Sequence, residues 1–256
     1  MTLIKAILNV TLRFQNLLSK ILRISRPEMR VVKSNLQTFR ESGGLITRVE
    51  LHIDDLNDSA GQASGHYFHQ DLSVAQDIHK RKPNRHVDIG GRFDGFVAHV
   101  ASFREIDVFD VRDIDVELKN VNFIQRNLLE LEESEITDSI SCLHSIEHIG
   151  LGRYGDPIDP DGHLKAFLIL NKLLKPEGLL YISFPIAQHS QVIFNKHRIF
   201  EPSEILNWET GINKLNLLNF DYVDDSGNFH PNAKITDAQE LRLKYGCGIY
   251  TFRKTR

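Results

Sequence analysis

The stretch His86-Val-Asp-Ile-Gly-Gly-Arg-Phe-Asp-Gly95 decides the fold, because a short apolar run leads directly into a glycine-rich turn. His86–Ile89 has the composition of a buried β-strand. The glycines that follow let the backbone approach a ligand closely and present amide groups at the start of a helix. We expect that helix over residues 93–103. The stretch therefore predicts a strand–turn–helix unit with a ligand at the turn.

Short apolar runs alternate with helical stretches through the rest of the chain. Strands are expected at residues 105–109, 121–124, 138–143 and 179–184, a helix at 164–174, a turn at 175–178, and two late, reversed strands at 215–223 and 244–253. Strands that alternate with helices form right-handed crossovers and a parallel sheet. The order predicts an α/β fold: a doubly wound, mostly parallel, Rossmann-like sheet with its ligand site at the carboxyl ends of the strands.

Composition excludes several classes of protein. The chain has 256 residues, of which 41% are hydrophobic and 25% charged, so it is globular rather than disordered. A net charge of −3 argues against a nucleic-acid partner. The two cysteines, Cys142 and Cys247, form no disulfide framework, and we expect a cytoplasmic protein.

The N-terminal segment differs in charge from the rest of the chain. Residues 1–33 carry seven Lys and Arg residues against the single acid Glu28. Apolar residues recur at helical spacing over residues 3–24, and Pro27 is expected to end that helix. This basic amphipathic helix packs either on the catalytic core or a second subunit, as in a homodimer, or on an anionic membrane surface through residues 1–30. Neither a membrane span nor a signal peptide is expected.

Three regions are predicted from these patterns. Residues 1–33 form the basic N-terminal helix, residues 34–84 a helical segment with a lid, and residues 85–256 the α/β domain. Within the second region, His66, Tyr67, Phe68 and His69 precede the first strand and are interpreted as the lid over the ligand, with aromatic packing as the alternative.

Asp110 strengthens the case for a ligand. It lies 20 residues after Gly90, at the end of the second predicted strand. A carboxylate there can accept hydrogen bonds from both hydroxyls of a ribose. The spacing favours a ligand that contains a nucleoside, against the alternative of a tight turn followed by an ordinary loop acid.

Several motifs in chain order resemble those of the class I S-adenosylmethionine-dependent methyltransferases. They are Asp88-Ile-Gly-Gly91, Asp110, Arg126-Asn-Leu128, Ser141-Cys-Leu-His-Ser-Ile-Glu-His148 and Leu174-Lys-Pro-Glu-Gly178. Over residues 60–253 the chain also resembles a narrower branch named for a Caenorhabditis domain of unknown function. Its hallmarks here include Gly65-His-Tyr-Phe-His-Gln-Asp71, Phe194-Asn-Lys-His-Arg198 and Tyr245-Gly-Cys-Gly248. Bacterial members of that branch are associated with polysaccharide biosynthesis.

The resemblance implies S-adenosylmethionine as the cofactor and assigns residues to it. The implied cofactor-binding residues are Asp88, Gly90, Gly91, Gly95, Asp110, Asn127 and Leu128. Two departures from the family pattern stand out. Arg92 and Phe93 occupy positions in the turn where glycine is usual, and Asn127 replaces an aspartate, although its amide oxygen can still accept a hydrogen bond.

The segment after the fourth strand carries candidate catalytic groups. Methyl transfer from a sulfonium needs an oriented acceptor and a base for its proton. We expect His144 or His148 to be that base, with Glu147 beside them. The alternative, which is not favoured, is a divalent metal on His144, Glu147 and His148, completed by His189 or His197.

Residues 150–162 are too irregular for a helix and are expected to form a loop that binds the acceptor. The candidate substrate residues are Arg153, Tyr154 and Asp156 of this loop and Asn195, His197 and Arg198 after the fifth strand. The combined prediction is an O-methyltransferase acting on a small, carbohydrate acceptor. The alternatives are an enzyme of the same fold acting on a nucleotide-linked sugar without methyl transfer, and a non-catalytic binding protein.

Overall fold

The computed structural model describes residues 26–52, 55, 58–208 and 215–255. The chain divides into two compact units, residues 1–62 and 63–256. The helix predicted over residues 3–24 lies outside the described residues. The proposed division of the chain at residues 33 and 84 stays a prediction. Within the described part, no helix has the length and apolar character needed to cross a membrane.

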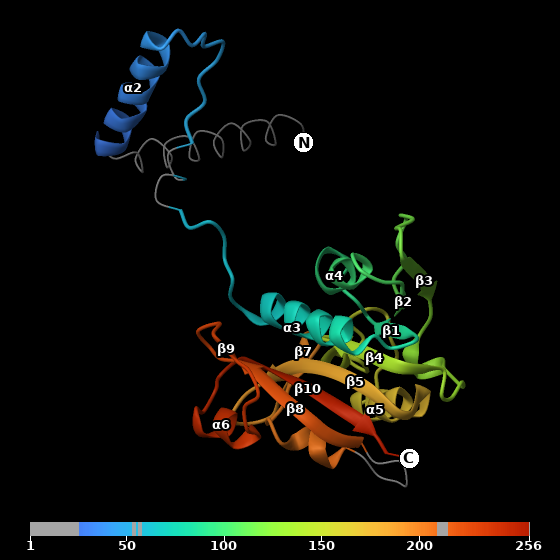
Figure 1. Cartoon of the computed structure of the whole chain (residues 1–256). Coiled ribbons are helices and arrows are strands. Elements are labelled where there is room, and N and C mark those ends of the chain that lie inside the picture. The colour runs from blue at the N-terminus through green and yellow to red at the C-terminus, as the bar shows by residue number, and fades with distance from the viewer. Residues whose placement is uncertain (1–25, 53–54, 56–57, 209–214, 256) are drawn as a thin grey trace, which may run out of the picture. The chain divides into compact units, whose positions relative to one another are not determined.

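The first unit contains helix α2 (Arg26–Glu41) (Figure 1). Pro27 lies in the first turn of this helix, where its missing N–H group would have no helical partner in any case. Glu28 in the first turn and Arg40 in the last complement the helix dipole.

The second unit is built on a sheet of eight strands in the order β3-β2-β1-β4-β5-β10-β8-β9 (Figure 1). The strands are β1 (His86–Ile89), β2 (Ile106–Asp110), β3 (Val121–Gln125), β4 (Thr137–Leu143), β5 (Leu174–Ile186), β8 (Leu215–Val223), β9 (Phe229–His230) and β10 (Gly246–Lys254). β1 to β5 are parallel, whereas β10 runs antiparallel between β5 and β8. The predicted doubly wound, mostly parallel, Rossmann-like sheet is confirmed.

Helices and short turns connect the strands. The helices are α3 (His66–Arg81), α4 (Ala98–Ala101), α5 (Gly162–Leu173) and α6 (Ile235–Glu240), and single helical turns lie at Phe93–Val97, Leu128–Glu130, Ile146–His148 and Glu204–Asn207. A small antiparallel hairpin pairs β6 (Gln191–Ile193) with β7 (His197–Ile199).

The turn predicted at residues 175–178 is instead a bulge within β5. Leu174 pairs with Thr137, and the next pair along joins Leu179 to Ser139, so four residues of β5 bulge out between the two pairs. Glu177 adopts a φ of +63° in the bulge. The Pro-Glu-Gly signal for a turn was correct locally, but Leu174 already pairs with β4 and therefore begins the strand.

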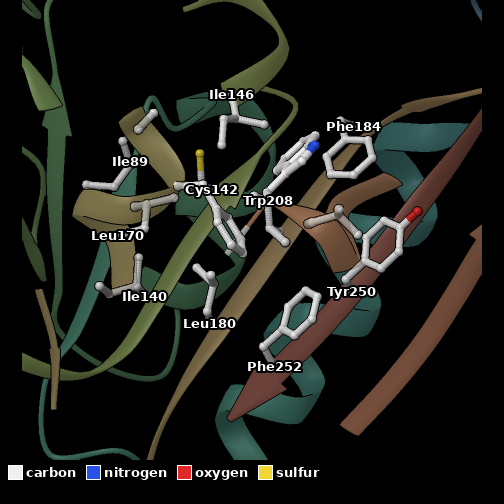
Figure 2. Packing of buried hydrophobic residues seen from close by; sticks show 14 of the residues in the cluster. Ile89, Ile140, Cys142, Ile146, Leu170, Leu180, Phe184, Trp208, Tyr250 and Phe252 are labelled. Atoms are coloured by element: carbon white, nitrogen blue, oxygen red, sulfur yellow. The ribbon is translucent and has the colours of Figure 1, made fainter. Parts of the chain in front are cut away.

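Both faces of the sheet are buried. Along β5, Leu180 and Ile182 belong to the apolar cluster that contains Phe167 of α5, and Figure 2 shows the packing around Leu180 within that cluster. The alternating residue Tyr181 belongs to a second cluster with Ile78 of α3. This alternation follows from the two-residue period of a strand. It fixes α3 against one face and α5 against the other, and leaves the carboxyl ends of the strands open.

Candidate functional site

A cavity of about 550 Å³ opens at the carboxyl ends of β1, β2 and β4. Its volume lies in the range of small-molecule sites. Most of the residues predicted for a site line it: Asp88, Gly90, Gly91, Asp110, Asn127, Leu128, His144, Glu147, His148, Arg153, Tyr154, Asp156 and His197. Three predicted residues, Gly95, Asn195 and Arg198, are not among its walls.

The turn after β1 requires its glycines. Gly90 has a φ of +70°, and a Cβ there would meet Ser145 Oγ at 2.1 Å. A Cβ on Gly91 would meet Asp88 Oδ2 at 1.9 Å. Gly95 allows a different close approach, since a Cβ added there would meet Asp71 Oδ2 at 2.4 Å. The first two glycines form a wall of bare backbone, and the third lets α3 approach the turn.

Two buried carboxylates lie beside this turn. Asp88 is fully buried; its Oδ1 accepts a hydrogen bond from Ser141 Oγ, while its Oδ2 has no hydrogen-bond partner among the described residues. Burial raises the pKa of Asp88 to about 7, and the negative charges of Asp71 and Asp110 add to the effect. Burial likewise raises the pKa of Asp71. Such a pair favours a positively charged group in the cavity.

Asp71 and its neighbour Gln70 belong to α3 and were not predicted as site residues. Gln70 Nε2 donates to Asp71 Oδ1 over 3.0 Å, and Ser183 Oγ donates to Gln70 Oε1 over 2.6 Å. The sequence does contain a signal for them. Both lie on the stripe of α3 that continues through Val74, Ala75 and Ile78, so polar residues occupy the buried face of an amphipathic helix.

Asp110, the predicted ribose ligand, has an internal partner. Arg112 donates to it from its backbone N over 2.8 Å, from Nε over 2.9 Å and from Nη2 over 2.6 Å. The guanidinium also lies 5.0 Å from the ring centroid of Tyr154. Asn127 is similarly engaged, since its Oδ1 accepts a hydrogen bond from Leu129 N over 3.1 Å as the cap of a helical turn.

The bulky residues that replace glycine in the turn line the cavity without closing it. The guanidinium of Arg92 lies 4.4 Å from the ring centroid of Tyr67 and forms an ion pair of 3.0 Å with Asp94. Phe93 packs against Phe123 on β3, with 5.9 Å between the ring centroids. Both side chains are therefore directed to partners at the wall.

Glu147 lies between the two candidate bases after β4. Its Oε1 is 2.9 Å from His144 Nδ1 and 3.7 Å from His148 Nε2, and its side chain is 1% exposed. Burial opposes the charged form of His144, but Cys247 and Glu147 outweigh it and raise the pKa of His144 well above 6.5. His144 also adopts a φ of +48°, which is uncommon for a residue other than glycine.

The pKa of His148 is shifted in the opposite direction to that of His144. Burial lowers its pKa below 6.5, so the imidazole is neutral near pH 7. Its Nδ1 lies 2.7 Å from the carbonyl oxygen of Lys196, and a carbonyl can only accept. The proton of the neutral ring therefore resides on Nδ1, which leaves Nε2 as a proton acceptor.

The substrate residues predicted from the sequence divide into two groups. Arg153, Tyr154 and His197 line the cavity. Asp156 also lines it, but its carboxylate accepts hydrogen bonds from the backbone N of Gly150 over 2.7 Å and of Tyr154 over 3.2 Å. It therefore holds the loop in shape.

Arg198 and Asn195 have other positions. Arg198 is 3% exposed and donates to the carbonyl oxygens of Ile149 over 2.7 Å and Pro160 over 3.0 Å. It fastens the two ends of the loop rather than facing an acceptor. Asn195 lies in the turn between β6 and β7 with a φ of +60°, and it is exposed.

The alternative metal set is not assembled. His144, Glu147, His148 and His197 do not bring their ligand atoms together in the part of the chain that the structure describes. Glu147 acts there as a hydrogen-bond acceptor for His144.

Solved structures share this architecture at low sequence identity. The N-methyltransferase NodS from Bradyrhizobium japonicum WM9, in complex with S-adenosylhomocysteine, is 13% identical, with a TM-score of 0.52 over 79% of this chain and 91% of that one. The chain therefore has a methyltransferase fold. The [4+2]-cyclase SpnF is 14% identical, with a TM-score of 0.53 over 77% and 86% of the two chains. The Bacillus YcgJ protein is 14% identical, with a TM-score of 0.50 over 73% and 99%.

The sequence also matches one protein-family model. Residues 102–222 match the family described as "Caenorhabditis protein of unknown function, DUF268". The expected resemblance to the Caenorhabditis domain is thus confirmed over residues 102–222, and the expected resemblance to methyltransferases is confirmed at the level of the fold. No curated protein matches the sequence.

Proposed function

We propose that the cavity binds S-adenosylmethionine and that the chain is an S-adenosylmethionine-dependent O-methyltransferase. The observation that carries the proposal is the pair of buried carboxylates, Asp88 and Asp71, beside the glycine turn. S-adenosylmethionine carries a sulfonium and an ammonium group, and a cation of this kind compensates the pair. The methyltransferase fold supports the same assignment.

The adenosine part is proposed to lie toward β2 and β3. Asp110 would accept hydrogen bonds from the ribose hydroxyls, which requires Arg112 to release it. Leu128 and Asn127 line this side of the cavity and would border the adenine. Gly90 and Gly91 would give the cofactor access to bare backbone beneath its methionyl part.

His148 is the proposed general base. In the proposed step, a hydroxyl oxygen of the acceptor bonds to the methyl carbon, the carbon–sulfur bond breaks, and the hydroxyl proton passes to His148 Nε2. Glu147, 3.7 Å from that atom, stabilises the imidazolium that forms. His144 is less suited, because its raised pKa keeps the ring protonated.

The proposed acceptor is a small carbohydrate used in polysaccharide biosynthesis. Tyr154 is 41% exposed at the cavity and offers an aromatic face to a sugar ring, and Arg153 and His197 supply polar groups nearby. A cytoplasmic location, contact of residues 1–30 with a membrane surface and a homodimer remain proposals from the sequence.

Calorimetric titration with S-adenosylmethionine and S-adenosylhomocysteine tests the cofactor directly. We expect one site per chain, and a loss of affinity of about 10- to 100-fold in Asp110→Asn, because a charged hydrogen-bond acceptor is removed. Asp107→Asn is the matched control, since Asp107 lies on the same strand and pairs with Arg85 away from the cavity. Absence of binding by the unmodified chain would contradict the proposal.

An enzyme that keeps this fold without methyl transfer is the second candidate. The Asp110–Arg112 pair favours it, because Asp110, the residue expected to bind the ribose, already forms an ion pair with Arg112. The fold alone does not decide between them, as a fold hosts several chemistries. Release of S-adenosylhomocysteine in the presence of sugars or nucleotide-linked sugars supports methyl transfer; product formation without its release supports the second candidate.

A further inference from the structure

Three potential metal ligands converge next to the cavity from distant parts of the chain. His66 begins α3, His144 follows β4, and Cys247 is the second residue of β10. One ligand atom from each lies within 4.8 Å of the other two. This set shares only His144 with the metal site considered from the sequence.

His144 is oriented as a metal ligand would be. Its Nδ1 is held at 2.9 Å by Glu147, so Nε2 is the ligand atom, and a bound metal would displace the proton from it. Nε2 is buried without a hydrogen-bond partner among the described residues, and the side chain is 5% exposed. A carboxylate on the far nitrogen of a histidine is the common arrangement behind a metal ligand, because it fixes the tautomer and the ring orientation.

The other two groups are available for coordination. Cys247 is a free, buried thiol, and its hydrogen-bond contacts are long: 3.6 Å to the carbonyl oxygen of Gly248 and 4.0 Å to Gln70 Oε1. His66 is the first residue of α3 and is partly exposed. The His66 ring stacks on that of His144, with 5.3 Å between the centroids.

We propose that His66, His144 and Cys247 form a three-ligand zinc site at the wall of the cavity. Two imidazoles and one thiolate suit zinc and disfavour magnesium, which prefers oxygen ligands. Tetrahedral coordination brings ligand atoms to within roughly 3.3–3.8 Å of one another, so small side-chain rotations complete the site. Three protein ligands leave a fourth position for water or an acceptor oxygen. The site does not depend on methyl transfer.

Metal titration of the full, untagged chain tests the proposal. After treatment with a chelator, we expect one zinc ion to bind per chain. Cobalt in its place should give a tetrahedral visible spectrum with a thiolate-to-cobalt charge-transfer band. Cys247→Ser should abolish that band and weaken zinc binding at least tenfold. Glu147→Gln should weaken binding about 10- to 100-fold while the band remains, since only the orientation of His144 is affected.

Matched variants separate coordination from folding. Cys142→Ala removes the other buried cysteine and should retain both the band and one zinc per chain. His66→Ala changes a partly exposed residue at the start of a helix, so it tests the site even if Cys247→Ser does not fold. His69→Ala is its control on the same helix. Failure of the chain to bind zinc, or binding undiminished in both His66→Ala and Cys247→Ser, would overturn the proposal.

Discussion

Arg112 binds both carboxylate oxygens of Asp110, the residue at the end of β2 that the sequence assigns to a ribose. Nε reaches Oδ1 at 2.9 Å and Nη2 reaches Oδ2 at 2.6 Å. A ribose can take these oxygens only if the guanidinium leaves. The side chain of Arg112 is 52% exposed, so water can solvate the released group.

Arg112→Met should tighten S-adenosylmethionine binding by up to about fivefold. The gain is small because a partly exposed ion pair contributes about 0–1 kcal/mol. Calorimetry measures it, with Arg85→Met as control, since Arg85 forms the equivalent pair with Asp107 outside the cavity. A tenfold loss of affinity instead would mean that Arg112 itself contacts the cofactor.

Cofactor affinity should rise with pH through the pKa of Asp88, which burial raises to about 7. A cation binds to the ionised carboxylate, so affinity at pH 8 should exceed that at pH 6 by about tenfold. Asp88→Asn should remove this dependence and bind more weakly, whereas Asp107→Asn should retain it. A pH-independent affinity in the unmodified chain would argue against a cation beside Asp88.

The raised pKa of Asp88 also predicts that folding stability falls as pH rises, whereas cofactor affinity rises. The folded protein holds a proton on Asp88 that the unfolded chain releases above pH 4, so this contribution is present at low pH and is lost as pH rises through about 7. Asp88→Asn should therefore be more stable than the unmodified protein at pH 8, with little difference near pH 4. Urea unfolding at the two pH values measures this, and a variant less stable at pH 8 would contradict it.

His148→Gln should lower the rate of methyl transfer about 10²- to 10⁴-fold, the usual contribution of a general base, with cofactor affinity unchanged. Since burial lowers the pKa of His148, the rate at saturating cofactor should be flat from pH 7 to 8 and fall only below pH 6.5. His79→Gln, on the exposed face of α3, is the control. Equal rates in both variants would exclude His148 as the base.

Arg198→Met should destabilise the fold by about 1–3 kcal/mol, because the carbonyl oxygens of Ile149 and Pro160, at the two ends of the loop, lose a charged donor that is itself buried. Arg153→Met, on the exposed part of that loop, should change stability by less than about 0.5 kcal/mol. Unfolding in urea compares them. If Arg198→Met has the same free energy of unfolding as the unmodified chain but no longer binds the acceptor, then Arg198 contacts the substrate, as expected from the sequence.

The strands were predictable because their apolar runs are short, continuous and bounded by polar turns. β1 and β8 have the expected bounds, and the carboxyl edge follows from strand order. The direction of a polar side chain was not predictable. Arg198 was expected after a strand at the site edge; it lies within β7 and donates to the carbonyl oxygen of Ile149, which only the folded loop places there.

Contacts between distant segments could not be predicted from the sequence either. Asp71 reaches the cavity only because α3 packs on the face of the sheet next to the glycine turn. The approach of His66 to Cys247 joins the start of α3 to the start of β10. Local periodicity places each residue on its own element, but the packing of the elements decides which of them meet.

A crystal structure grown with excess S-adenosylhomocysteine tests the central claim most directly. The account predicts that the ribose hydroxyls lie within hydrogen-bond distance of Asp110, that Arg112 has turned away, and that the ammonium group of the ligand lies beside Asp88 and Asp71. Density for the ligand elsewhere, or an intact Asp110–Arg112 pair with no ligand in the cavity, would contradict it.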